Sequence, residues 1–234
     1  MAILDAVRQA VPEHVPCTVK LRRGTDLSAL AENNFRFILE SAIGGGYAGA
    51  VVHGRTVEQK YHGPADWQWL TSLAHEYGQV IASSGEHFVL GGSGDIWCAA
   101  DIFRMIQTTG LHWVSVARGC IGNPWIFHQA LALMRGDTEQ ALQPPTIAQQ
   151  REVLREHFEL ACRVNGEKSA SFEMRKFGIK FSRHHPEHQQ VAKAFIAVKG
   201  LADWQAVLDE FYCVNGAGRL ADMSVATPLA CDVV

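Results

Sequence analysis

The sequence predicts an α/β fold followed by an all-helical segment. Three observations support this prediction. Short apolar segments ending in a polar residue alternate with longer segments of helical period, which is typical of parallel strands connected by helices. A glycine-rich turn follows each of the last two apolar segments. Beyond the Pro-Pro pair at residues 144–145 no further strand-like segment occurs, and only helical periodicity remains.

The first part of the chain contains four predicted strand–helix units. The strands are expected at residues 17–21, 49–53, 88–91 and 112–117. A helix ending near residue 10 precedes them, and helices follow at about residues 27–42, 66–77, 96–108 and 124–134. Asp26 is expected to cap the first of these following helices, and the glycines at 44–46 are expected to end it.

The two glycine-rich corners, at residues 91–95 and 118–124, suggest how these units are arranged. Successive corners of this kind place backbone N–H groups and helix N-termini side by side, where they hold a phosphate. In a (β/α)8 barrel such a site follows the last two strands, and a complete barrel needs eight units. Residues 1–140 are therefore predicted to be the second half of a (β/α)8 TIM barrel.

The second part is predicted to be an all-helical C-terminal domain over residues 146–213. Its four helices are expected at residues 146–165, 168–184, 187–198 and 203–212. The tail, residues 214–234, has small residues and no clear period, so we expect it to be irregular and loosely ordered.

Composition narrows the class of protein. The 234 residues are 47% hydrophobic and 19% charged, which is ordinary for a soluble globular chain. The six cysteines are scattered without a C-x-x-C pair, which favours reduced thiols in the cytoplasm over disulfides or a zinc site. The sequence has neither an apolar run of membrane-spanning length nor a signal peptide pattern, so no membrane span is expected.

The net charge of −3 gives no general attraction to nucleic acid, so such binding would need a local patch. Residues 168–199 hold seven Lys and Arg against two Glu, which makes them a candidate patch. The alternative is an ordinary solvated helix face. His184 and His188 are four residues apart, but Pro186 lies between them and no third ligand is evident, so no metal is expected.

Each predicted strand ends in a polar group, and in a parallel barrel these ends form the active face. Lys20 ends the first strand, His53 the second, and Arg118 follows the fourth. Lys20 could offer its charge to a cofactor and His53 a donor or acceptor near neutral pH. Equally, Lys20 could extend to solvent and His53 could be a core residue. Arg118 could clamp a phosphate or pair with Asp95.

Several motifs resemble those of the tRNA-dihydrouridine synthase family. The most specific are Val-His-Gly-Arg-Thr at residues 52–56 and Gly-Asn-Pro-Trp at residues 122–125. Further similar segments lie at residues 18–22, 59–61, 65–67, 92–96, 118–119 and 174–176. They occur in family order and span about residues 6–212.

The resemblance implies an FMN-binding (β/α)8 barrel with a helical tRNA-binding domain. Such enzymes use NADPH to reduce FMN, which reduces the 5,6 double bond of uridine in tRNA. Lys20 and His53 would then approach the flavin ring. The phosphate would be held by Ser93, Gly94, Asp95, Ala117 and Arg118, and tRNA by Arg55, Arg175, Lys176, Lys180 and Arg183. At the positions of Ser93 and Ala117 the family usually has Asn and Gly, respectively.

The family's proton-donating cysteine, in an Asn-x-Gly-Cys-Pro context, has no counterpart in this sequence. Neither Cys17 nor Cys120 matches it, so no catalytic residue is assigned. We expect an N-terminally truncated synthase that aggregates or binds FMN weakly, because half a barrel exposes two sheet edges. The alternatives are a catalytically inactive RNA-binding fragment and another FMN-dependent TIM-barrel oxidoreductase.

Overall fold

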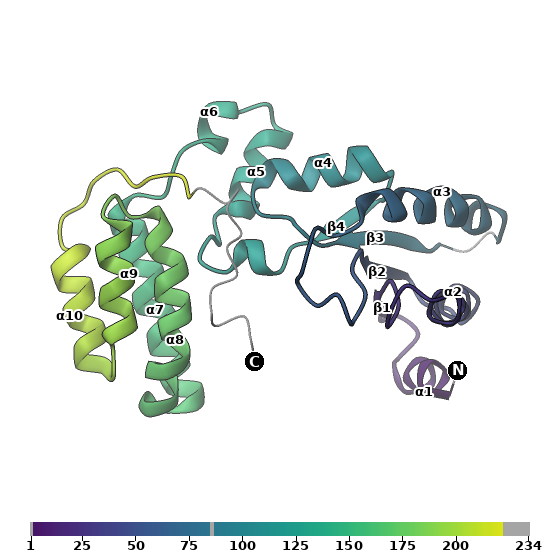
Figure 1. Ribbon diagram of the computed structural model, residues 1–234, viewed down its shortest axis with the longest axis horizontal. Helices are drawn as coiled ribbons and strands as arrows, with labels where there is room; N and C mark the ends of the chain where they lie inside the picture. The colour runs from purple at the N-terminus through teal and green to yellow at the C-terminus, as the bar shows by residue number, and fades with distance from the viewer. Residues whose placement is uncertain (1, 85–86, 222–234) are drawn as a thin grey trace. The chain divides into compact units, whose positions relative to one another are not determined.

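The computed structural model describes residues 2–84 and 87–221, which form two compact units (Figure 1). The first unit comprises residues 1–96 and 100–117, and the second comprises residues 97–99 and those from 118 onward. The chain therefore divides at Arg118, whereas the predicted domain boundary lies near residue 140. As a result α5 (Ile126–Met134) and α6 (Thr138–Ala141) belong with the helices that follow them.

The first unit is built on a parallel four-stranded sheet, which confirms the predicted α/β class. The strands are β1 (Thr18–Arg22), β2 (Gly49–His53), β3 (Val89–Ser93) and β4 (Trp113–Ser115), and they lie in that order. Each strand is hydrogen-bonded to its sequence neighbour in parallel register. Arg22, His53, Ser93 and Ser115 are consecutive partners in this register, so the carboxyl ends of the strands lie level with one another.

Helices cover one face of this sheet. They are α2 (Ala29–Gly44), α3 (Trp67–Ser84) and α4 (Ala99–Thr109), and Figure 1 shows them along one side of the strands. Ala50, Val52 and Leu90 point into the core they form, as do the helical residues Leu39 and Leu70. The short helix α1 (Ala2–Ala10) adds to this core through the partly buried Leu4.

The ends of two helices differ from the sequence predictions. Ser28, not Asp26, caps α2, because its hydroxyl accepts the N–H of Ala31. The Asp26 carboxylate instead accepts the N–H of Ser28 at 2.7 Å and so holds the capping residue. Helix α4 begins at Ala99 rather than residue 96, so it does not start directly at the glycine corner.

Gly91, the predicted last residue of this strand, and Gly92 both lie within β3, which continues to Ser93. A Cβ on Gly91 would overlap the indole of Trp113 on the neighbouring strand. A Cβ on Gly92 would lie 2.7 Å from Leu111 Cδ1 and 2.8 Å from Met105 Sδ, on the opposite face. Both glycines are therefore required by packing, and the turn itself begins at Gly94, whose φ is +118°.

The second unit is helical in its described residues. Its longer helices are α7 (Ile147–Asn165), α8 (Glu167–Phe181), α9 (His188–Ala197) and α10 (Leu201–Phe211), with 3-10 turns at Arg118–Cys120 and Ser182–His184. Figure 1 shows α7 to α10 side by side. Their core is aromatic: the rings of Phe158 and Trp204 stack at 4.6 Å, and Phe195 packs against Trp204 at 4.8 Å.

Residues 214–221 of the tail form no helix or strand, but several of them are hydrogen-bonded to the helical unit. Gly216 O accepts the N–H of Ile147, and His184 O accepts the N–H of Arg219 at 2.8 Å. The Arg219 guanidinium also lies 2.8 Å from His188 Nδ1. These bonds tie residues 215–219 to α7 and to the turn before α9, and residues 222–234 lie outside the described part. Among the described helices none is both long and apolar enough to cross a bilayer.

We expect Gly91→Val to destabilise the first unit by about 1–3 kcal/mol, because the added side chain must displace the Trp113 indole. The preference of valine for strands would raise the free energy of unfolding, but this gain is smaller than the loss caused by the overlap. Urea unfolding would measure the change. Gly78→Ala is the matched control, because a Cβ at this exposed position in α3 meets nothing within 4 Å. That substitution should stabilise the chain by about 1 kcal/mol, and equal effects of both would contradict this account.

Candidate functional site

The face of the sheet opposite the helices is polar at the carboxyl ends of the strands. Successive residues of a strand point to opposite faces. Since Leu21 and Val52 pack against the helices, their neighbours Lys20, Arg22 and His53 share the other face. Arg22 lies opposite His53 in the register, and Ser93, which is 3% exposed, lies opposite His53 on β3. The sequence analysis missed Arg22, although its position two residues after Lys20 was a usable signal.

His53 is held as a neutral hydrogen-bond donor. Its Nδ1 accepts the backbone N–H of Arg55 at 3.1 Å, so the neutral ring carries its proton on Nε2. Burial, assisted by the positive charges of Arg22, Arg55 and Lys20, lowers the pKa of His53 to about 4. The ring is therefore uncharged at neutral pH. It is only half-buried, and its Nε2 has no hydrogen-bond partner among the described residues.

Lys20 brings a positive charge to the same face. Burial, and then repulsion by Arg22, lowers the pKa of its ammonium group. Within the described residues Lys20 forms no ion pair with a carboxylate. Lys20 and His53 thus leave a charged donor and a neutral donor unengaged on the same face of adjacent strands, which suits a ligand with negative charge and hydrogen-bond acceptors.

The glycine corner after β3 closes tightly around Gly94. A Cβ at this position would lie 2.7 Å from the Cβ of Ala65 and 3.3 Å from Cε1 of His53. Its φ of +118° is also one that other residues rarely adopt. The next residue, Asp95, has a positive φ of +55°. Only glycine allows the backbone to pass this close to the His53 ring.

The side chain of Asp95 is committed to a buried ion pair. Its two oxygens lie 2.7 and 2.8 Å from Nη2 of Arg55, and its Oδ2 accepts the N–H of Ala65 at 2.6 Å. The Arg55 guanidinium also donates to the carbonyl of Gly63. Asp95 therefore ties the loop after β2 to the corner after β3. Its carboxylate would repel a phosphate, so any phosphate contact at this corner must come from the backbone.

One predicted residue needs correction from this geometry. Arg55 was expected to contact RNA, but it is 3% exposed and lies inside the loop, so its position does not fit a surface contact. The Asp95 carboxylate forms an ion pair with Arg55, and the alternative pairing of Asp95 with Arg118 stays a prediction. Arg118 lies 4.8 Å above the ring of Trp97. Of the predicted phosphate residues, Arg118 belongs to the second unit and the other four, Ala117 included, to the first.

The Gly-Asn-Pro-Trp segment has a packing role within the second unit. A Cβ on Gly122 would lie 2.7 Å from backbone and side-chain carbons of Lys180, and its φ is +83°. The Trp125 ring meets Phe181 and His184 edge-to-face at 5.8 and 5.6 Å. The segment therefore fixes the chain after Arg118 against the end of α8.

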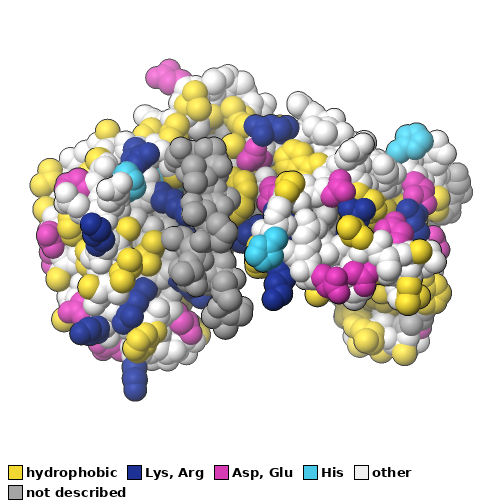
Figure 2. All heavy atoms as spheres, in the orientation of Figure 1, with side chains coloured by type: hydrophobic (Ala, Val, Ile, Leu, Met, Phe, Trp, Pro, Cys, Tyr) yellow, Lys and Arg dark blue, Asp and Glu magenta, His cyan; other side chains and the backbone are white. Residues whose placement is uncertain are grey.

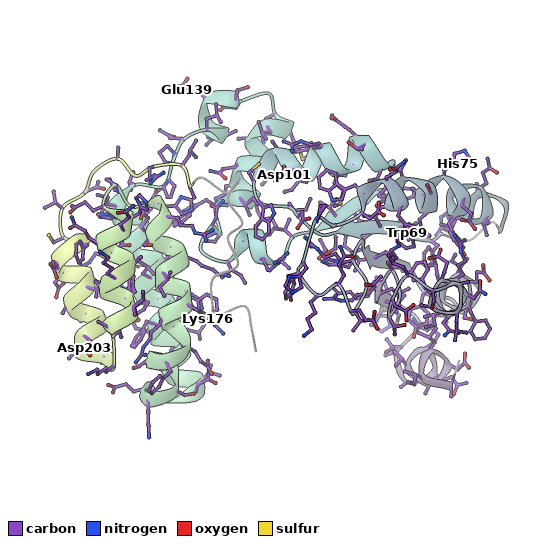
Figure 3. All side chains as sticks on the ribbon, viewed as in Figure 1. Trp69, His75, Asp101, Glu139, Lys176 and Asp203 are labelled. Atoms are coloured by element: carbon purple, nitrogen blue, oxygen red, sulfur yellow. The ribbon has the colours of Figure 1, made fainter. Side chains whose placement is uncertain are left out.

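The predicted basic residues lie on α8 and just beyond it. Figure 2 shows Lys and Arg side chains distributed among apolar ones over the visible face of the helical unit, and Figure 3 labels Lys176. Lys176 is exposed, whereas Arg175, Lys180 and Arg183 are partly buried. The Arg175 guanidinium lies 4.5 Å from the ring of Phe172, and the Lys176 ammonium lies 5.4 Å from that of Phe177. Lys176 and Lys180 are one turn apart and share a helix face.

These features define an α/β protein with a cation-lined site at the carboxyl ends of parallel strands, where α/β enzymes bind their ligands. Residues 1–213 match the family model described as Dihydrouridine synthase (Dus). The chain belongs to this family, as its motifs indicated.

Curated relatives support the same family. The chain is 29% identical over 223 residues to "Probable tRNA-dihydrouridine synthase" of Mycobacterium leprae, covering 95% of the chain and 54% of the relative. It is 30% identical over 215 residues to the protein of the same name from Treponema pallidum, covering 92% and 60%. A "tRNA-dihydrouridine(16) synthase" of Cupriavidus necator is 30% identical over 147 residues, 63% of the chain and 42% of the relative. The chain thus spans about half the length of these relatives.

We expect Asp95→Asn to lower the free energy of unfolding by about 3 kcal/mol, because it leaves the buried Arg55 charge uncompensated. Urea denaturation would measure this loss. Glu159→Gln removes the same charge from an exposed pair with Arg155 and should cost less than about 1 kcal/mol. Similar losses for the two variants would show that the Arg55–Asp95 pair is not structurally important.

Proposed function

We propose that the chain is the FMN- and tRNA-binding part of a tRNA-dihydrouridine synthase, which reduces uridine in tRNA to 5,6-dihydrouridine with NADPH as reductant. The observation that carries this proposal is the family match over residues 1–213. The cation-lined strand ends support it, because that site suits an anionic cofactor. On this proposal the four-stranded sheet is the second half of a (β/α)8 barrel, and α7 to α10 form the tRNA-binding domain.

The residues of the first unit fit FMN on three counts. Lys20 and the Nε2–H of His53 offer a positive charge and a donor to an electron-rich ring system. The Gly94 corner carries no side chain and its backbone passes close to the His53 ring, because a Cβ there would lie 3.3 Å from His53 Cε1. The buried Nη1 of Arg55 has no hydrogen-bond partner among the described residues and could serve a ligand acceptor. When bound, FMN would supply the hydride that uracil receives.

In this mechanism the residues of the chain bind and orient. Lys20 would stabilise negative charge on the cofactor ring, and His53 would donate a hydrogen bond without changing protonation near neutral pH, because its pKa is about 4. The backbone N–H groups of the Gly94 corner would contact the phosphate, and a role for the Arg118 guanidinium of the second unit stays a prediction from the resemblance. The Arg55–Asp95 pair would keep the His53 ring in place through the Arg55 N–H.

The proton that completes reduction of the uracil ring requires a general acid. Cys17 is 8% exposed, precedes the amino end of β1, and its Sγ lies 3.1 Å from Arg8 Nη1. Cys17 therefore lies at the amino end of β1, away from the carboxyl end where the polar site residues lie. We propose that the acid is the cysteine of an Asn-x-Gly-Cys-Pro segment outside these 234 residues.

A polypeptide extended by the upstream reading frame tests the proposed activity. With FMN, NADPH and an unmodified tRNA transcript, it should add two hydrogen masses per modified uridine, measured by mass spectrometry of digested tRNA. Gly94→Val should abolish retention of FMN and the mass gain together, because its side chain would overlap Ala65 and press on the His53 ring. Gly78→Ala adds a Cβ that meets nothing within 4 Å, so it should leave FMN retention and the mass gain unchanged.

Three outcomes would decide between the proposal and its alternatives. A soluble extended chain that binds tRNA but neither retains FMN nor reduces uridine would favour an inactive RNA-binding fragment. Retention of FMN with reduction of another substrate, and none of uridine, would favour a different FMN-dependent oxidoreductase. An upstream frame that encodes Asn-x-Gly-Cys-Pro, together with the mass gain, would support the synthase.

We also expect Arg175→Glu combined with Lys176→Glu to weaken binding of a tRNA transcript by about tenfold or more at moderate salt, because both cations lie on α8 among other basic residues. The slope of log affinity against log salt should fall in magnitude by about two, one for each lost phosphate contact. Gel shift over a salt series measures both quantities.

The control is Arg135→Glu combined with Arg163→Glu, which reverses two exposed charges outside α8. It changes the net charge of the chain equally and should alter the affinity much less. If the two double variants weaken binding to the same degree, overall charge accounts for the effect and α8 has no particular role.

A further inference from the structure

The second unit contains a cavity of about 320 Å³ that the proposed function does not use. Its walls come from the start of α5, the short helix α6, the connection after it and the first turn of α7. Figure 3 locates the region by Glu139, which α6 carries. A volume of this size lies at the lower end of the range for small-molecule sites. It has room for one heterocycle the size of a nucleobase rather than for a long ligand.

The lining of this cavity is polar but uncharged. Besides two prolines and a threonine, the cavity is lined by Trp125, His128, Gln129, Gln140, Gln143 and Gln149. None of its lining residues is an acid, a lysine or an arginine. A phosphate or a metal ion would find no opposite charge here. A neutral ligand with several donors and acceptors matches this lining better.

The glutamine amides of the cavity are available for a ligand. Gln129 is 8% exposed, yet no described residue hydrogen-bonds to its side-chain amide. The amides of Gln140 and Gln143 likewise have no partner among the described residues. Gln149 uses only its oxygen, which accepts the N–H of Thr146 at 2.8 Å. Gln129 lines the cavity, so its unpaired amide faces the space where a ligand would lie and can complete its hydrogen bonds there.

The remaining walls are flat and rigid. The Trp125 indole is held edge-to-face by Phe181 and His184, at 5.8 and 5.6 Å. His128 and two proline rings add further flat surface. Indole and imidazole rings are the side chains on which unstacked bases lie in RNA complexes. A glutamine amide presents a donor beside an acceptor, which matches the edge of a base, most closely the N6 and N7 of adenine.

We propose that this cavity binds an unpaired purine base of a bound RNA, best an adenine, separate from the uridine that is reduced. The inference rests on the proposed function in taking tRNA as the RNA. The cavity is joined to the basic helix by a ring contact: Trp125 packs on Phe181, which directly follows Lys180 in α8. The basic residues contact phosphates without regard to sequence, whereas the cavity reads one base.

The first test uses adenosine as the probe and the chain labelled for NMR. The side-chain NH₂ signals of Gln129 and Gln143 should shift in a saturable way on addition of adenosine, and less with uridine. Gln143→Ala, at the exposed rim, should reduce the response at Gln129, whereas Gln189→Ala, an exposed glutamine on α9, should not. Absence of a saturable shift with any of the four nucleosides would overturn the proposal.

The second test uses a tRNA transcript and fluorescence anisotropy. Gln143→Ala and Gln129→Leu should each lower the affinity by about fivefold or more and leave the salt slope unchanged, because neither contacts a phosphate. Gln129→Leu is buried, so if it fails to fold, Gln143→Ala alone decides the question. Affinity within twofold of the original chain for Gln143→Ala would overturn the proposal.

Failure of this proposal is distinguishable from failure of the proposed function. If only the cavity inference is wrong, the glutamine variants bind tRNA normally while the α8 charge reversal still weakens binding and dihydrouridine still forms. If the chain does not bind tRNA at all but adenosine still shifts the Gln129 signal, the base site stands as a nucleoside site and the proposed function fails instead.

Discussion

The ion pair between Arg55 and Asp95 is the interaction on which the site of the first unit depends. It joins the loop after β2 to the corner after β3, and the backbone N–H of Arg55 in turn holds the His53 ring by its Nδ1. The pair is largely buried, with side-chain exposures of 4% and 21%, so removing either partner leaves a charge without compensation. The tight passage of Gly94 beside Ala65 and His53 completes the same structure.

Successive residues of each strand point to opposite faces of the sheet, so core residues and polar site residues lie on different faces. One face carries Val52 and Leu90 into the core under the helices, while the other carries Lys20, which is paired with Val51, and His53, which is paired with Arg22. Because the strands are parallel and in register, Lys20 and His53 lie diagonally across two adjacent strands although 33 positions separate them in sequence. The second unit separates its chemistry differently, with basic residues on α8 and uncharged amides around the cavity near α6.

Much of the fold could be predicted because it follows local pattern. Strand β2 was predicted at its observed bounds, and each helix from α7 to α10 lies within about three residues of its predicted range. The misassigned positions were those decided by distant neighbours. The third strand was predicted to end at Gly91 because glycine usually marks a turn, but it continues through Gly92 to Ser93, and packing against Leu111 and Met105 requires the glycine at 92. Asp26 was assigned as the cap because it follows the turn before the helix, but Ser28, two residues later, has the same capping chemistry and occupies the position.

The sequence alone determined the family, the α/β class and the residue types at the strand ends, because motifs and hydrophobic period are local properties of the chain. Tertiary structure alone decided which of these residues are available. It buried Arg55 against Asp95, lowered the pKa of His53 first by burial of the ring and then by the charges of three nearby cations, and placed Gln129 in the wall of a cavity without a hydrogen-bond partner among the described residues. The hydrogen bonds of Asp95 join residues that are 30 and 40 positions apart in the sequence, so a local sequence pattern cannot predict them.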